Sequence, residues 1–173
     1  MATTAHIPIE VYLRSSEYEP DAEFVDGEIE ERPMGEFGHA DWQQAIQRWF
    51  AQNAKTWNVR ALAELRVQVA PTRFRVPDVT VLDRALAVEQ IITHPPIAVF
   101  EVLSPEDTIV RMKRKLADYA QMGIPQIWVI NPETAPASGS FERYDSGRLN
   151  PASRFEQGSI QFEMAEIAQL LQG

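Results

Sequence analysis

Two carboxylates interrupt apolar segments, and their placement indicates chemistry that depends on a metal ion. Asp78 follows Pro77 inside the segment FRVPDVTVL (74–82), and Glu101 interrupts IAVFEVL (97–103). A carboxylate within a buried strand is costly unless another group compensates its charge. A divalent cation shared by two such carboxylates does this, and hard oxygen ligands favour Mg²⁺ or Mn²⁺. The structural alternative is a buried arginine partner or a bound proton for each acid.

Basic side chains that follow Glu101 could complete a phosphate-cleaving site. A lysine two residues after this acid would give a common nuclease arrangement, but Leu103 occupies that position. The next helix carries four basic residues, of which Lys113 and Lys115 flank the apolar stripe. A flanking lysine can lay its stem over the core and bring its ammonium to the metal, where it stabilises developing charge. For each basic residue of this helix a solvated surface position is the alternative: Arg111, Lys113, Arg114 and Lys115.

Two further candidates precede these segments. His39 begins the first long helix and is either an ordinary helix-start residue or a group at the mouth of the site. Glu23 lies in EFVDGEI (23–29), where Asp26-Gly27 predicts a β-hairpin because glycine tolerates positive φ. The sequence contains no glycine-rich phosphate loop, nucleophile elbow or two-histidine metal motif.

Hydrophobic periodicity defines the elements that must position these residues. Apolar residues at three- and four-residue steps predict a helix over 39–57, and Ser104, Pro105 and Asp107 predict a helix start that Gly123 ends. The remaining segments are expected as strands at 59–69, 74–82, 97–103 and 124–130, a loop at 133–140, edge hairpins at 141–163 and a short helix at 165–171.

The order of these elements predicts an α/β fold with a mixed central sheet flanked by helices and an N-terminal β-hairpin. The strand–helix–strand step at 97–130 should be a right-handed parallel crossover, and the earlier strands should form a meander. At 173 residues the chain is expected to be one domain, with an acidic hairpin segment (1–36), a catalytic core (39–131), and edge strands with a terminal helix (141–173).

Composition excludes several classes of protein. The chain has no cysteine, which excludes a disulfide scaffold, an iron–sulfur cluster and a thiol nucleophile. No apolar run approaches the roughly 18 residues of a membrane span, and the start lacks a secretory signal, so a cytoplasmic protein with no membrane partner is expected. The net charge of −9 argues against a general nucleic-acid coat protein. Residues 60–115, with nine bases and seven acids, still allow a local DNA-facing patch.

Several short motifs together resemble the Uma-two family of restriction endonucleases, within the PD-(D/E)xK nuclease superfamily. The resemblance covers roughly residues 10–170, and the motifs that carry it are EFVDGE (23–28), Gly38-His39, VPDV (76–79), FEVLSPED (100–107), RKLADY (114–119) and GIPQIWVINP (123–132). It implies a restriction-endonuclease-like fold, with metal-binding acids at Asp78 and Glu101 and the lysine supplied by Lys115. It also implies that Glu23 and His39 lie near the metal.

The leading hypothesis is a Mg²⁺- or Mn²⁺-dependent endonuclease that hydrolyses DNA phosphodiester bonds. A homodimer is expected, because two-fold dimers are the commonest way to cut both strands of a duplex. The alternative is a catalytically inactive nuclease fold that serves as a binding or regulatory module, which the leucine at position 103 and the net charge would suit. A third hypothesis is hydrolysis of RNA or a small phosphoester.

Overall fold

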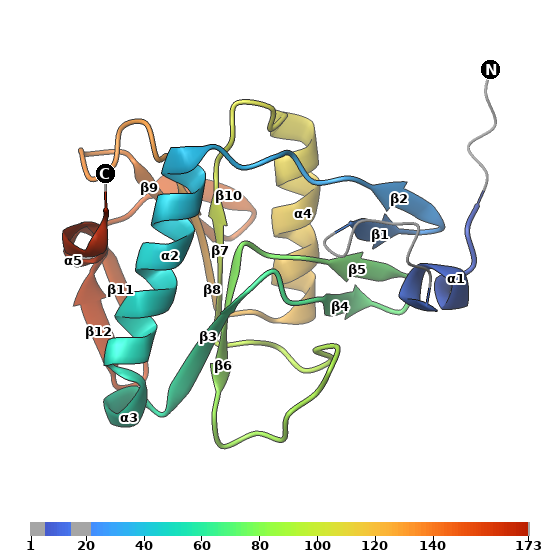
Figure 1. Cartoon of the computed structure of the whole chain (residues 1–173), viewed down its shortest axis with the longest axis horizontal. Coiled ribbons are helices and arrows are strands. Elements are labelled where there is room, and N and C mark those ends of the chain that lie inside the picture. The colour runs from blue at the N-terminus through green and yellow to red at the C-terminus, as the bar shows by residue number, and fades with distance from the viewer. Residues whose placement is uncertain (1–5, 15–21, 173) are drawn as a thin grey trace.

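A central mixed sheet organises the structure, a computed structural model that describes residues 6–14 and 22–172 (Figure 1). Its strand order is β10-β9-β8-β7-β6-β3, in which β7 and β8 run parallel and the other neighbours are antiparallel. The strands are β3 (Val59–Ala63), β6 (Val79–Asp83), β7 (Ala98–Val102), β8 (Gln126–Ile130), β9 (Phe141–Asp145) and β10 (Arg148–Pro151).

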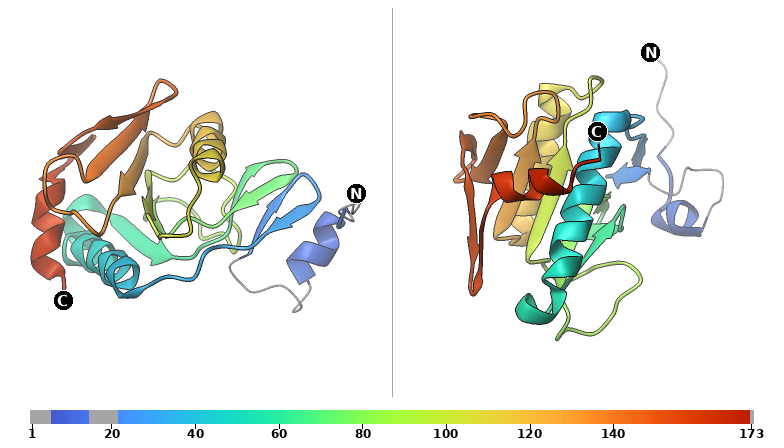
Figure 2. Two further views of the ribbon diagram at one scale, coloured as in Figure 1. Left: turned by 90° about the horizontal axis from the view of Figure 1, so that it is seen from above. Right: turned by 60° about the vertical axis from the view of Figure 1, so that its left-hand side comes forward.

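Helices cover both faces of this sheet, as Figure 2 shows when the molecule is seen from above. The helix α4 (Ile109–Met122) connects β7 to β8 and packs on one face. The opposite face is covered by α2 (Phe37–Gln52), α3 (Ala54–Trp57), α5 (Met164–Ile167), a 3₁₀ turn (Ala168–Leu170) and the hairpin of β11 (Arg154–Gln157) and β12 (Ile160–Glu163). Among the described helices, none is long and apolar enough to cross a membrane.

A smaller antiparallel sheet lies beside the central one, with the strand order β2-β1-β5-β4. Tyr12 of α1 (Ile9–Arg14) packs against Phe24 and Phe74 of this sheet. The expected N-terminal hairpin is confirmed, with Asp26 and Gly27 at φ values of 50° and 94° in its turn. The strands are β1 (Glu23–Val25), β2 (Glu28–Glu30), β4 (Val67–Ala70) and β5 (Arg73–Arg75). Residues 1–5 and 15–21 of the expected acidic segment lie outside the described residues.

The expected meander is present as the antiparallel strands β3, β6 and β7, but its strands are not continuous as predicted. Each of the two predicted strands is divided, and β3 pairs with β6 while the β4–β5 hairpin between them joins the smaller sheet. Glu64, with φ of 53°, ends β3, because a positive φ is incompatible with an extended strand. Pro77 separates β5 from β6, and it has no N–H to donate to a ladder. The predicted helix 39–57 is likewise divided at Asn53.

The start of α4 also differs from the prediction. The helix begins at Ile109, and the hydroxyl of its N-cap Thr108 accepts a hydrogen bond from the backbone N–H of Arg111. Asp107 instead accepts a bond from the backbone N–H of Ser104, at 2.7 Å, and so closes a turn before the helix. The end at Gly123 is confirmed, with φ of 94°. The parallel β7–β8 pair, the hairpins at 141–163 and the mixed sheet flanked by helices are also confirmed.

Candidate active site

The register of β6 and β7 brings the two predicted carboxylates together. Val79 pairs with Phe100 in this antiparallel ladder, so extending the register by one position places Asp78 opposite Glu101. Residues opposite each other in antiparallel strands have Cβ atoms about 5 Å apart on one face of the sheet. Both side chains are 97% buried, which agrees with the apolar strands that carry them. The pair therefore lies inside the fold, on the face covered by α4.

Asp78 is surrounded by donors from β7, α2 and the segment that precedes α2. Its Oδ2 accepts a hydrogen bond from the backbone N–H of Val102 at 2.7 Å and lies 3.2 Å from Nε2 of His39. Its Oδ1 pairs with the guanidinium of Arg32, and Gln43 donates to its backbone oxygen. Burial alone would raise the pKa of Asp78, but the contact with His39 and the charge of Arg32 outweigh it and lower the pKa to about 2. This carboxylate is therefore ionised at neutral pH.

Glu101 has a different environment because it contacts the covering helix α4. The Tyr119 hydroxyl donates to Oε1 at 2.6 Å, and the Lys115 ammonium lies 3.3 Å from Oε1 and 3.4 Å from Oε2. Burial is the main cause that raises the pKa of Glu101 to about 8, with Lys115 opposing it and the charges of Asp78 and Glu23 adding to it. The two neighbouring carboxylates thus have pKa values shifted in opposite directions.

Lys115 joins the site to a second layer of charges. Its Nζ lies 3.0 Å from Oε1 of Glu23, so the ammonium bridges Glu23 and Glu101. Burial lowers the pKa of Lys115, but these two carboxylates outweigh it and raise the pKa above its usual range, so the ammonium stays charged. The buried Arg75 contacts Glu23 with its Nη1, 3.1 Å from Oε2. Its Nη2 pairs with Oδ2 of Asp118 in α4 at 2.7 Å. This layer fixes the position of Glu23 under the lysine.

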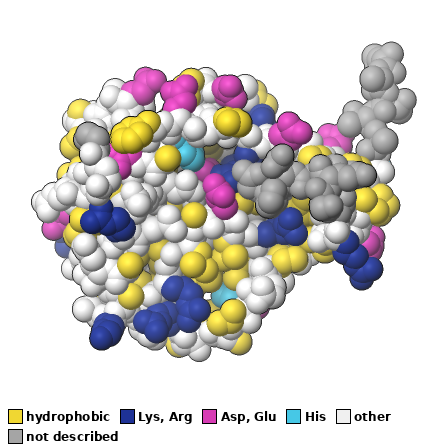
Figure 3. Space-filling view, viewed as in Figure 1, with side chains coloured by type: hydrophobic (Ala, Val, Ile, Leu, Met, Phe, Trp, Pro, Cys, Tyr) yellow, Lys and Arg dark blue, Asp and Glu magenta, His cyan; other side chains and the backbone are white. Residues whose placement is uncertain are grey.

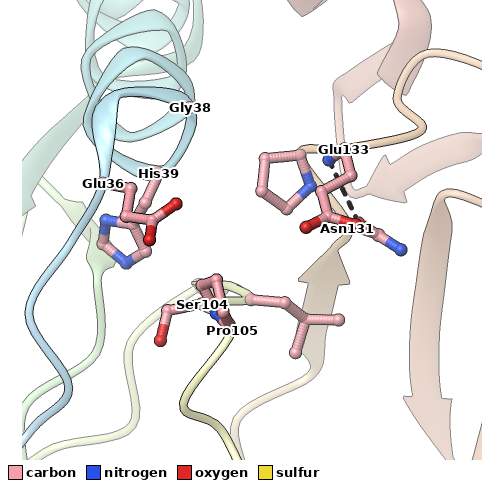
Figure 4. A pocket seen from close by; sticks show the side chains of 9 residues that line it. Glu36, Gly38, His39, Ser104, Pro105, Asn131 and Glu133 are labelled. Carbon is pink, nitrogen blue, oxygen red and sulfur yellow. Dashed lines mark hydrogen bonds between the residues drawn. The ribbon is translucent and has the colours of Figure 1, made fainter.

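A pocket of about 350 Å³ opens beside the cluster (Figure 4). In this view the N-terminal end of α2, with Glu36 and His39, faces the segment of Ser104 and Pro105 after β7. The segment after β8, with Asn131 and Glu133, forms the third wall. His39 borders this pocket and also contacts Asp78, so the pocket leads from the surface toward the carboxylates.

The outer rim of the site is acidic and apolar. On the face shown in Figure 3, acidic side chains follow the upper edge of the molecule, one group of Lys and Arg lies at the lower end, and other basic side chains lie near the centre. Several exposed apolar side chains belong to the segments that begin α2 and α4: Met34, Phe37, Ile109 and Val110.

The donor chemistry of the cluster fits a small divalent cation. Among residues 6–14 and 22–172, no three His, Asp or Glu side chains are close enough together to hold a metal by themselves. Mg²⁺ does not require three, because it keeps several water molecules and binds proteins through one or two carboxylates. Asp78 and Glu101 supply two hard oxygen donors in a buried position, beside the cationic side chains of Arg32 and Lys115 that contact them. These two residues would hold the ion.

All five residues expected from the sequence meet in this one cluster: Glu23, His39, Asp78, Glu101 and Lys115. His39 is the third residue of α2 and also borders the pocket, so it is both a helix-start residue and a group at the mouth of the cluster. Sequence analysis missed Arg32 and Tyr119 as members. Tyr119 could have been found, because it lies one helical turn after Lys115 and so shares its face. Arg32 gave a weaker signal: residues 1–36 contain only two basic side chains.

A mixed sheet flanked by helices, with two buried carboxylates and a lysine at one end, defines a restriction-endonuclease-like α/β protein. The model of the Uma2 family, described as "Putative restriction endonuclease", matches residues 9–161. The chain belongs to this family.

Comparison with solved structures supports the same fold. The chain is similar to the crystal structure of a putative nuclease belonging to DUF820 from Anabaena variabilis, with a TM-score of 0.77 and 19% sequence identity. The match covers 94% of this chain and 99% of that one. A comparison with curated proteins gives no match.

Proposed function

We propose that the protein is a metal-dependent endonuclease that hydrolyses DNA phosphodiester bonds. The observation that carries this proposal is the position of Lys115, whose ammonium lies 3.3 Å from a buried carboxylate that is itself opposite Asp78. A lysine beside paired acids can serve phosphodiester hydrolysis, in which negative charge develops on the phosphate. The family and the fold support the same class of activity.

Each residue of the cluster has a proposed role. Asp78 and Glu101 hold Mg²⁺ or Mn²⁺, which when bound would activate a water molecule and polarise the phosphate. Lys115 stabilises the charge of the transition state. His39 positions the Asp78 carboxylate, and Glu23 positions the Lys115 ammonium through its 3.0 Å contact. The homodimer expected for cutting both strands is part of this proposal.

The site contains a lysine although position 103 is a leucine. Leu103 takes the place two residues after Glu101, where a strand lysine would stand, and it packs with the core under α4. Lys115 reaches the same carboxylate from the helix instead, because it lies on the buried face of α4 between Met112 and Tyr119. The proposal therefore favours a catalytic protein over an inactive binding module.

Metal binding tests this proposal first. We expect calorimetric titration with MgCl₂ and MnCl₂ to detect binding to the wild-type chain and to lose it for Asp78→Asn and Glu101→Gln. Asp145→Asn is the matched control, because Asp145 is an exposed acid on β9 and its replacement removes the same charge. Cleavage of duplex DNA should fall at least about a hundredfold for both site variants.

The same assay separates the alternatives. Parallel reactions with single-stranded DNA, RNA and a small phosphodiester identify the substrate class. Metal binding without cleavage of any of these substrates would contradict catalysis and favour a binding module. Cleavage that persists in Asp78→Asn would contradict the assignment of the site.

A further inference from the structure

Arg32 lies in a segment that belongs to neither a sheet nor a helix. It follows β2, which ends at Glu30, and precedes α2, which begins at Phe37. Its guanidinium reaches back to Oδ1 of Asp78, and only 7% of its side chain is exposed. The segment is held from outside by Arg111 of α4, which donates to the backbone oxygen of Glu31 at 2.6 Å. The arginine is therefore directed into the carboxylate cluster.

The other contacts of the two carboxylates come from the central sheet and its helices. Oδ2 of Asp78 contacts the backbone of β7 and His39 of α2, and Glu101 contacts Lys115 and Tyr119 of α4. Arg32 alone among these partners lies in the connecting segment 31–36, outside every helix and strand. Of these contacts of the two acids, the one between Arg32 and Oδ1 of Asp78 can thus change with the least disturbance of the core.

Space for such a change lies next to the arginine. A pocket of about 490 Å³ is bordered by Arg32 and its neighbours in the segment 31–35, and by His39, Ala40 and Gln43 on the first turns of α2. The guanidinium could move into this space and remain hydrated. A cation approaching Oδ1 of Asp78 would otherwise meet a positive charge already in contact with that oxygen, and like charges at such distances repel strongly in a buried site.

We propose that Arg32 is an internal counter-cation that sets the affinity of the site for divalent metal. Its guanidinium neutralises the Asp78 carboxylate, and a divalent ion must displace it from Oδ1 to bind. This inference rests on the proposed metal site at Asp78 and Glu101. It assigns to Arg32 the role of a displaceable charge, in contrast to Lys115 of α4, whose ammonium contacts both Glu101 and Glu23.

Metal titration of Arg32→Gln tests the inference. MgCl₂ and MnCl₂ alone are titrated calorimetrically into the wild-type chain, Arg32→Gln and Arg111→Gln. Removal of the competing charge should tighten metal binding by about tenfold or more. Arg111→Gln is the matched control, because it removes an equal charge from a side chain that contacts the same segment but not the carboxylates, and its affinity should equal that of the wild type.

Thermal unfolding with and without metal tests the inference even if Arg32→Gln is less stable than the wild type. Without Arg32 the buried Asp78 carboxylate loses the guanidinium that pairs with Oδ1, so Arg32→Gln should unfold at a lower temperature than the wild type when metal is removed by a chelator. Saturating MnCl₂ should then raise its unfolding temperature more than that of the wild type, because metal that binds only the folded state stabilises it. Rescue by MnCl₂, followed by circular dichroism, supports the inference even for a poorly folded variant.

The outcomes distinguish this inference from the proposed function. If the wild type binds metal and Arg32→Gln binds it equally or more weakly, without rescue, Arg32 is not a competing cation and the metal site stands. If neither protein binds metal, both the metal site and this role of Arg32 are overturned. Weaker binding together with loss of cleavage would instead make Arg32 a group that helps to retain the metal or the phosphate.

Discussion

The two faces of the central sheet are built from the same strands and yet differ in content: the α2 face holds an apolar cluster rich in aromatic residues, whereas the α4 face holds an apolar cluster beside the charged residues. On the α2 face, Phe100 and Trp128 pack with Phe155, whose ring also stacks on Phe162 at 4.8 Å. On the α4 face, the residue after Phe100 is Glu101, which contacts an ammonium and a hydroxyl of the covering helix. The strand alternation sends successive side chains to opposite faces, so one step along β7 separates an aromatic core from a charged site.

The two faces are expected to contribute differently to the stability of the fold. Aromatic side chains buried on the α2 face contribute through area removed from water, about 1.5–3 kcal/mol for each fully buried phenylalanine. Buried ion pairs such as those on the α4 face often contribute little net stability, because desolvation offsets their attraction. The charged face is thus poorly explained by folding alone, which is consistent with a functional site.

The largest effect on the free energy of unfolding is expected from Phe155→Ala, which removes an aromatic ring from the α2 face. Phe155 is fully buried at the centre of the aromatic cluster, so its loss leaves a cavity and should lower the free energy of unfolding by about 3–5 kcal/mol. Urea denaturation followed by circular dichroism measures this change. Phe37→Ala is the control, since Phe37 is 70% exposed, and its effect should stay within about 0.5 kcal/mol.

The same variant tests whether the faces are independent. Metal affinity of folded Phe155→Ala should equal that of the wild type within error, because this ring packs among aromatic side chains on the face opposite to the carboxylates. A large loss of metal affinity would show that the two faces are coupled through the strands.

A smaller effect on stability and a specific effect on the site are expected from Tyr119→Phe. The variant removes the hydroxyl that donates to Glu101 at 2.6 Å while keeping the ring. Loss of one buried hydrogen bond should cost about 1 kcal/mol of unfolding free energy. Because Glu101 is a proposed metal ligand, loss of this partner should weaken Mg²⁺ or Mn²⁺ binding by about tenfold or more.

Tyr144→Phe provides the matched control for this change. Tyr144 of β9 is partly buried, and its hydroxyl has no hydrogen-bond partner within the described part of the chain. It should therefore leave both stability and metal affinity close to wild type. Unchanged metal affinity in Tyr119→Phe would mean that Glu101 does not need this hydrogen bond to hold its position.

The smallest effect is expected at the start of α4, the helix that covers the charged face. Thr108→Ala removes the N-cap hydroxyl and should lower the free energy of unfolding by about 1 kcal/mol. Ser104→Ala should change it by no more than about 0.5 kcal/mol, because its buried hydroxyl has no partner among the described residues. The reverse order, measured by thermal and urea unfolding, would place the cap at Ser104 as the sequence motif predicts.

Local signals predicted much of the site and less of the sheet connections. The carboxylates were found because acids in apolar strands are unusual, and the lysine was found as one of two flanking candidates. The strand boundaries were wrong at Glu64 and Pro77, where a positive φ and a missing N–H divide apparently continuous apolar segments. The helix start was wrong because Ser104 and Asp107 form a turn whose residue types imitate a helix cap.

The sequence by itself determined the features that depend on neighbouring residues. Strand alternation places Phe100 and Glu101 on opposite faces, and the conformational freedom of glycine ends α4 at Gly123 with φ of 94°. These properties follow from local sterics and side-chain periodicity.

Only the tertiary structure decided which charges meet. Arg32 pairs with Asp78 across 46 positions, and Glu23 reaches Lys115 from the smaller sheet. No periodicity relates these residues, because their approach depends on how the connecting segment and two sheets pack around α4. The environment that shifts the pKa of Asp78 down and that of Glu101 up therefore exists only in the folded chain.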